Sequence, residues 1–192
     1  RPPSALRRRG ERVHAGGVRL SLPYRPPYDW DALFAALTAR GDAVEGRRWS
    51  RMLTRDVDGA EGSVTVEPGE AGRVSVCVEA DDLKALPGVL ARVRRVFDLS
   101  ADPEAIGRDL SADPALRPLV AARPGLRLPG DWIDDGPPDQ VRDAPNDRLN
   151  DETLAVRAEA WRPWRAYGAL HLALAGVSGA DLMENDDARR AA

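Results

Sequence analysis

Acidic side chains gather in one stretch of the chain that could bind a cation. Residues 131–151 hold seven aspartates against two arginines. A calcium loop needs oxygen ligands at positions 1, 3 and 5, glycine at position 6 and glutamate at position 12. Counted from Asp131, position 3 is Ile133 and position 12 is Arg142, which excludes such a loop. The stretch has few apolar residues, so residues 131–150 are predicted to form an irregular or disordered acidic loop.

Aromatic side chains recur towards the C-terminus in the motif W-R-P-W-R-A-Y. Trp161, Trp164 and Tyr167 lie at helical spacing, and His171 follows one turn later. Electron-rich rings can stack on a flat cationic ligand. The helical spacing alone, however, already explains the three aromatic residues as packing residues. His171 is expected to form a hydrogen bond within the same core.

The N-terminal segment is basic. Residues 1–12 carry five arginines against the single acidic residue Glu11. Such a cluster suits a phosphate backbone, which makes Arg7, Arg8 and Arg9 candidate DNA contacts. The alternative is a solvated basic tail over residues 1–17. The whole chain has a net charge of -3, so no general nucleic-acid-binding surface is indicated.

Composition limits the class of protein. Of the 192 residues, 43% are hydrophobic and 31% are charged, and the mean hydropathy is -0.43. No apolar run approaches the roughly 20 residues that a membrane span needs. The single cysteine, Cys77, excludes an internal disulfide and a cysteine metal cage. We therefore expect a cytoplasmic monomer with no metal and no cofactor. The first residue is not Met, and an internal or processed beginning is expected.

The elements before residue 100 predict an α+β unit. Val18 to Tyr24 alternates as a half-buried strand, and Asp29 can cap a helix that ends at Gly41. Residues 44–53 predict one long strand or two short ones. Valines at 64–66 and 74–78 predict two more strands, and a helix is expected to begin at Pro87. The expected fold of residues 18–100 is an antiparallel sheet with both helices on one face.

The remainder predicts short helices and loops. Residues 101–130 contain two helical patterns, restarted at Pro103 and Pro114, followed by a linker. Residues 151–176 predict two helices. The first is capped by Asn150 or Asp151 and closes near Trp161, and the second runs from Pro163 to Gly176. Residues 177–192 predict a flexible tail.

Four motifs in chain order carry a resemblance to a known family. They are Y-R-P-P-Y-D-W at 24–30, F-D-L at 97–99, A-R-P-G-L-R-L-P-G at 122–130 and W-R-P-W-R-A-Y at 161–167. Together they resemble the AlkA-type 3-methyladenine DNA glycosylases. The resemblance implies a TATA-binding-protein-like N-terminal domain over residues 18–100. It also implies excision of alkylated bases such as 3-methyladenine from double-stranded DNA, in base-excision repair.

The resemblance also implies site residues. In this family a damaged base is flipped into an aromatic pocket, of which Trp161, Trp164, Tyr167 and His171 would be the remnant. The family places its catalytic aspartate at a set interval before W-R-P-W, and Asp139 in P-D-Q-V-R stands near that interval. A carboxylate there would stabilise the oxocarbenium charge that develops on the sugar. An aromatic residue often follows the histidine by two positions, where this chain has Ala173.

The chain departs from the family pattern in one respect, and this departure leads to more than one hypothesis about its function. In the family a long helical segment with a helix-hairpin-helix lies between L-P-G and W-R-P-W, whereas here only residues 131–160 lie between them. The chain thus resembles a member that has lost most of its catalytic core. Three hypotheses follow: an active glycosylase, a non-catalytic remnant or DNA-associated scaffold, and a fragment of a DNA-binding transcriptional regulator. The third rests on P-S-A-L-R-R-R at 3–9, which resembles the end of an AraC-type helix-turn-helix domain.

Overall fold

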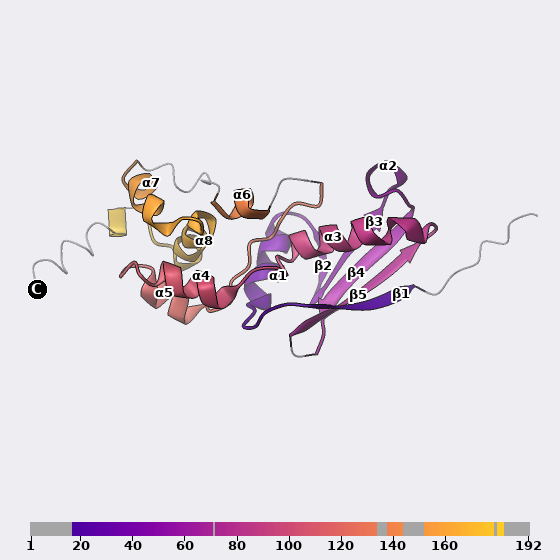
Figure 1. Ribbon diagram of the computed structural model, residues 1–192, viewed down its shortest axis with the longest axis horizontal. Helices are drawn as coiled ribbons and strands as arrows, with labels where there is room; N and C mark the ends of the chain where they lie inside the picture. The colour runs from indigo at the N-terminus through magenta and orange to yellow at the C-terminus, as the bar shows by residue number, and fades with distance from the viewer. Residues whose placement is uncertain (1–16, 71, 134–137, 144–151, 179, 183–192) are drawn as a thin grey trace, which may run out of the picture.

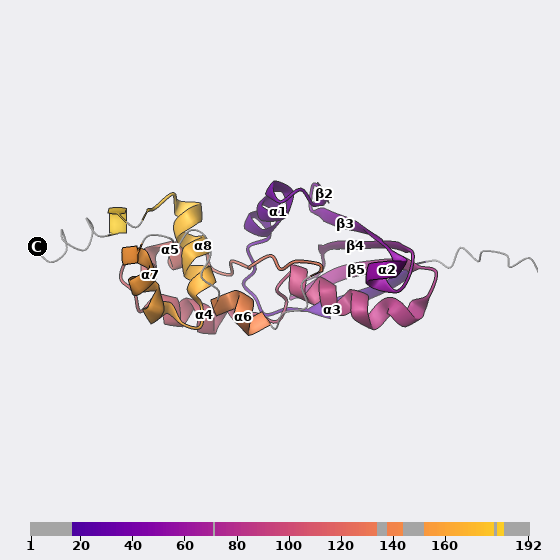
Figure 2. The same cartoon turned by 90° about the horizontal axis from the view of Figure 1, so that it is seen from above.

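The chain folds into two lobes placed end to end (Figure 1). The computed structural model describes residues 17–70, 72–133, 138–143, 152–178 and 180–182. Residues 17–100 form the sheet lobe, and residues 101–122 with 152–182 form the helical lobe. The linker and a short helix run between them, and the view from above shows the same division (Figure 2). The basic tail with Arg7, Arg8 and Arg9 lies outside the described residues.

A five-stranded antiparallel sheet forms the centre of the sheet lobe. Its strand order is β1-β5-β4-β3-β2. The first strand pairs with the last, and Leu20 lies opposite Val76 in this register. In β1, β4 and β5 the more buried apolar residues alternate with more exposed residues, most of them polar. The strands are β1 Val18–Pro23, β2 Ala43–Glu45, β3 Arg48–Leu53, β4 Gly62–Pro68 and β5 Arg73–Ala80.

Two helices cover one face of this sheet, α1 (Trp30–Ala39) and α3 (Leu86–Val96), as predicted. The carboxylate of Asp29 accepts a hydrogen bond from the backbone N–H of Ala32 at 3.0 Å, which caps α1. Pro87 lies in the first turn of α3, where its missing N–H costs nothing. The core between helices and sheet is made of Leu22, Trp30, Leu33, Phe34, Leu37, Trp49, Leu53, Val64, Val66, Val74, Val76, Val78, Val89, Val93, Val96, Phe97, Leu99 and Trp132.

The structure of the sheet lobe decides between the one or two strands predicted for residues 44–53, and it contains a short helix that was not predicted. The segment predicted as one or two strands is a hairpin of β2 and β3, which turns at Gly46 with a φ of 59°. A short helix, α2 (Arg55–Asp58), lies between β3 and β4. The Asp58 carboxylate accepts a hydrogen bond from the N–H of Thr54 at 2.9 Å, so it closes this single helical turn.

The prediction of an irregular acidic loop is wrong for residues 138–143, whereas residues 131–133 form no helix or strand. Trp132 is only 3% exposed, packs against Trp49 and donates its indole N–H to Asp58 at 2.9 Å. Further along, residues 138–143 form the helix α6 (Pro138–Asp143). The average composition of a segment indicates whether it is solvated. It does not show that a single large side chain, such as Trp132, is buried, or that arginines of other elements bind the carboxylates of the segment.

Short helices build the helical lobe around a second core. They are α4 (Pro103–Leu110), α5 (Arg117–Ala122), α7 (Glu152–Ala158), the 3₁₀ turn η3 (Glu159–Trp161) and α8 (Arg165–Ala175). Among the described residues, no helix is both long and apolar enough to cross a bilayer. The core residues are Ala101, Ile106, Leu110, Ala115, Leu116, Val120, Leu154, Ala158, Trp161, Tyr167, Ala169, Leu172 and Leu182.

Several boundaries in the helical lobe differ from the prediction. The second pattern begins a helix at Arg117 and not at Pro114, because the Asp113 carboxylate accepts from the N–H of Ala115 and holds this segment in a turn. The last helix begins at Arg165 and not at Pro163, and it ends at Gly176 as predicted. Residues 180–182 are helical and Leu182 is buried, so they are not part of a flexible tail. The predicted caps Asn150 and Asp151 lie outside the described residues.

Candidate functional site

Three of the four family-like motifs meet at the junction of the two lobes. Gly125 approaches Pro27 so closely that a Cβ atom on Gly125 would lie 2.5 Å from the Pro27 carbonyl. Its φ of 83° is a conformation that favours glycine. Arg127, which is 2% exposed, lies over the Tyr28 ring at 4.5 Å and donates to the Pro27 carbonyl at 3.0 Å. The Tyr28 hydroxyl donates to the carbonyl of Phe97 at 2.5 Å.

Asp98, from the F-D-L motif, links this junction to the fourth motif. It is buried and has a positive φ of 45°. Its carboxylate accepts hydrogen bonds from the hydroxyl of Tyr167 and from Arg142 of α6, the latter at 3.0 Å. Burial, followed by the charge of Asp98, raises the pKa of Tyr167 well above its ordinary value, so this phenol remains a donor. The motifs therefore join the lobes through a network of buried polar groups.

The two tryptophans of W-R-P-W-R-A-Y donate hydrogen bonds to aspartates of the helical lobe. The indole N–H of Trp161 donates to Asp113 at 2.8 Å, and Arg157 donates to the same carboxylate at 2.6 and 2.7 Å. Burial alone would raise the pKa of the Asp113 carboxyl, but these hydrogen bonds outweigh it and lower the pKa to about 2. Trp164 donates to Asp109 at 3.0 Å. Each of these tryptophans thus has a structural partner.

His171 lies beside Tyr167 at a small cavity. The cavity has a volume of about 60 Å³ and is lined by both side chains. Burial lowers the pKa of His171 to about 4, although a hydrogen bond with the backbone of Leu119 opposes this shift. The imidazole is therefore neutral at pH 7. Its Nδ1 atom is buried and has no hydrogen-bond partner within the described part of the chain.

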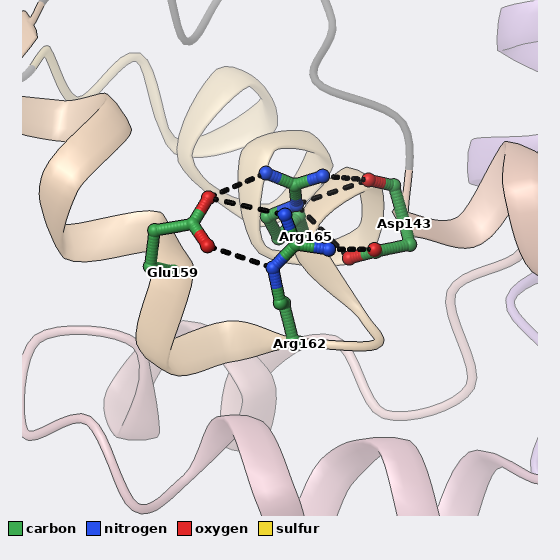
Figure 3. Close-up of polar contacts among 4 residues, drawn as sticks. All are labelled: Asp143, Glu159, Arg162 and Arg165. Carbon is green, nitrogen blue, oxygen red and sulfur yellow. Dashed lines mark hydrogen bonds and ion pairs between the residues drawn. The ribbon is translucent and has the colours of Figure 1, made fainter.

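The helix that carries Asp139 is attached to the helical lobe by ion pairs. Arg165 donates to Asp143 at 2.9 Å and to Glu159 at 2.6 Å, and Arg162 pairs with the same two carboxylates (Figure 3). The two arginines lie between Asp143 at the end of α6 and Glu159 of η3. The backbone of Asp139 is part of α6, and its side chain lies outside the described residues. The structure thus places α6 against α8, near the aromatic motif.

The roles of the residues that organise this site had no direct signal in the sequence. Asp98 and Arg127 are buried and Asp113 is half-buried, and each has a partner at least thirty positions away in the chain. Only Asp98 and Arg127 stand inside recognised motifs. Within the described ranges, no group of three His, Cys, Asp or Glu side chains could hold a metal ion.

Comparison with known proteins agrees with the motifs. The family model for the AlkA N-terminal domain matches residues 19–133, which is more than half of the chain. The chain belongs to the AlkA N-terminal domain family. The resemblance read from the four motifs is confirmed, and so is the mixed α+β fold with an antiparallel sheet.

Two curated relatives of this AlkA-family chain show how much of a longer protein it spans. It is 37% identical over 135 residues to a probable bifunctional transcriptional activator/DNA repair enzyme AlkA of Mycobacterium tuberculosis, covering 66% of this chain and 27% of the relative. It is 34% identical over 115 residues to DNA-3-methyladenine glycosylase 2 of Escherichia coli, covering 57% of this chain and 38% of the relative. A solved 3-methyladenine DNA-glycosylase from Archaeoglobus fulgidus matches with 21% identity and a TM-score of 0.43, covering 54% and 35% of the two chains. The chain thus spans less than two fifths of the length of these relatives.

Proposed function

We propose that this AlkA-family chain is a DNA-associated scaffold in base-excision repair and does not itself release alkylated bases. The relatives are named as DNA repair enzymes, which supports damaged double-stranded DNA as the partner and the bacterial cytoplasm as the place of action. A monomer without metal or cofactor remains part of this proposal.

One observation supports the absence of excision. Tyr167 and His171, which the resemblance assigns to the base pocket, line a cavity of about 60 Å³. Binding pockets for small organic ligands usually have volumes of roughly 300–1,000 Å³. Trp161 is 2% exposed and Tyr167 is fully buried, and each donates to an aspartate of the chain. These side chains are core residues, so opening them to a flipped base would break hydrogen bonds and packing contacts.

The second candidate is a minimal glycosylase that uses Asp139. The ion pairs of Asp143 with Arg162 and Arg165 favour it, because they tie α6 to the helix of the W-R-P-W motif. The position of Asp139 relative to that motif would then be maintained even though the helix-hairpin-helix pattern is missing from the sequence.

Excision of 3-methyladenine from methylated duplex DNA separates the two candidates. The chain and its Asp139→Asn variant are compared, with the Escherichia coli relative as the positive control and circular dichroism as the check on folding. We expect no release above the protein-free rate from either form. Release by the chain that the Asp139→Asn substitution abolishes would establish the minimal glycosylase. Fluorescence anisotropy with a labelled duplex tests the scaffold, and no binding at low salt would overturn it.

A further inference from the structure

A second cavity lies between the sheet lobe and α6, and it is about ten times the size of the one beside His171. Its volume is about 580 Å³. It is bordered by the C-terminal turns of α1 and α3, the linker after Leu128 and the helix α6. Both views show α6 near the end of α3 that is closer to the helical lobe (Figures 1 and 2). The volume falls within the range of pockets that hold small organic ligands, roughly 300–1,000 Å³.

Four arginines from three elements line this cavity. Arg40 ends α1, Arg94 and Arg95 lie in the last turn of α3, and Arg142 belongs to α6. Of the described residues, two carboxylates, Asp98 and Asp131, share the lining. Helix C-termini favour positive charge, and most of these arginines also have partners: Arg40 pairs with Asp42 at 2.7 Å, and Arg95 donates to the backbone carbonyl of Asp131 at 3.0 Å.

The two carboxylates already have partners inside the protein. Asp98 accepts from Tyr167 and Arg142, and Asp131 accepts from the backbone N–H of Ile133 at 2.8 Å. Neither forms an ion pair with Arg94, which is exposed and whose guanidinium has no hydrogen-bond or ion-pair partner among the described residues. Within that part of the chain, the Arg94 guanidinium therefore lines the cavity without a counter-charge.

The same cavity also has apolar walls. Leu128, Pro129 and Val141 contribute side chains to it, together with Ala91 of α3. Guanidinium groups bind phosphate and carboxylate through parallel hydrogen bonds, and apolar walls favour a ligand body that leaves water. A site with both features selects an anion that carries an apolar or aromatic body over a bare inorganic ion.

We propose that the cavity between α3 and α6 binds a small organic anion, whose phosphate or carboxylate group lies at Arg94 and whose apolar body lies against Leu128 and Val141. This site does not depend on the function proposed above. No sequence motif pointed to it, because its cations come from three elements that are distant in the chain.

Calorimetric titration of the full chain with 2-naphthyl phosphate tests the proposal. We expect a dissociation constant below about 1 mM, with 2-naphthol and inorganic phosphate each binding at least about tenfold more weakly. Removal of one charge-assisted contact should weaken binding of 2-naphthyl phosphate about tenfold in Arg94→Gln. The matched control is Arg19→Gln, which removes an exposed arginine from β1 and should leave binding unchanged.

A second variant tests the location without removing charge. Ala91→Phe should fill part of the cavity and weaken 2-naphthyl phosphate binding, while the melting temperature stays near that of the parent because Ala91 is exposed. The proposal is overturned if 2-naphthyl phosphate does not bind at millimolar concentration, or if Arg94→Gln and Ala91→Phe both bind it as the parent does. Equal binding of 2-naphthol would overturn the role of the anion, and equal binding of inorganic phosphate would overturn the role of the apolar walls.

Discussion

The sheet lobe and the helical lobe hold their elements together in different ways. In the sheet lobe, backbone ladders join five strands, and alternating residues such as Val64, Val76 and Val78 form a continuous apolar layer under two helices. In the helical lobe the helices are short, and isolated helices of fewer than about 12–15 residues are marginal in water. There, carboxylates such as Asp113 and Asp143 accept hydrogen bonds from arginines and a tryptophan of other helices. Local pattern thus specifies one lobe, and long-range polar pairing specifies much of the other.

The largest effect is expected from the apolar core of the sheet lobe. Trp49 is fully buried, packs edge-on against Phe97 and also contacts Trp132. Trp49→Ala should lower the free energy of unfolding by about 3–5 kcal/mol, since it removes a large side chain and leaves a cavity. Urea unfolding followed by circular dichroism measures this. Met52→Ala on the same strand is the control, because Met52 is 71% exposed and its loss should cost no more than about 0.5 kcal/mol. Equal losses in the two variants would contradict this picture of the core.

Acid should weaken the helical lobe through His171. Burial lowers the pKa of His171 to about 4 in the folded chain, below the value of about 6.5 in unfolded chains. The unfolded state therefore binds more protons, so stability is complete above pH 6.5 and falls as the pH drops towards 4. We expect the parent to lose roughly 3 kcal/mol more than His171→Leu between pH 7 and pH 4. Urea midpoints at the two pH values test this, and identical losses in parent and variant would show that His171 is not the responsible group.

A small effect is expected from the ion pairs at the surface of the helical lobe. The side chain of Arg162 is 49% exposed, and its partner Glu159 is 55% exposed. Water and salt screen such pairs, so Arg162→Gln should lower the urea midpoint only slightly, and this loss should shrink in 1 M NaCl. Paired urea titrations at low and high salt measure it. A loss as large as that of Trp49→Ala, unchanged by salt, would mean that the helical lobe depends on this cluster for its stability.

The same contrast explains what the sequence could predict. Period-two alternation from Val74 to Val78 and the Asp29 cap are local signals, and both were confirmed in the sheet lobe. The turn at Asp113 depends on a side-chain hydrogen bond with Ala115 that the helical pattern at Pro114 does not show, and the helix α6 is bound by Arg165, which is 22 positions from Asp143. The start of one helix and the structure of residues 138–143 were therefore predicted wrongly.

The candidate site also has one part that the sequence could predict and another part that it could not. The motifs identified the family, but the residues that join them, such as Asp98 with Tyr167, are visible only when the chain is folded. The catalytic role of Asp139 and the DNA contacts of Arg7, Arg8 and Arg9 remain predictions.

Thermal unfolding of a truncated chain tests the division into two lobes most directly. A chain that ends at residue 133 keeps Trp132, which is buried against Trp49 and donates to Asp58. The matched control ends at residue 130 and lacks that side chain. If the sheet lobe is complete in itself, the longer chain will melt in one cooperative transition, and the shorter one will melt at a lower temperature. A chain ending at residue 133 that shows no cooperative transition would contradict the separation of the two cores.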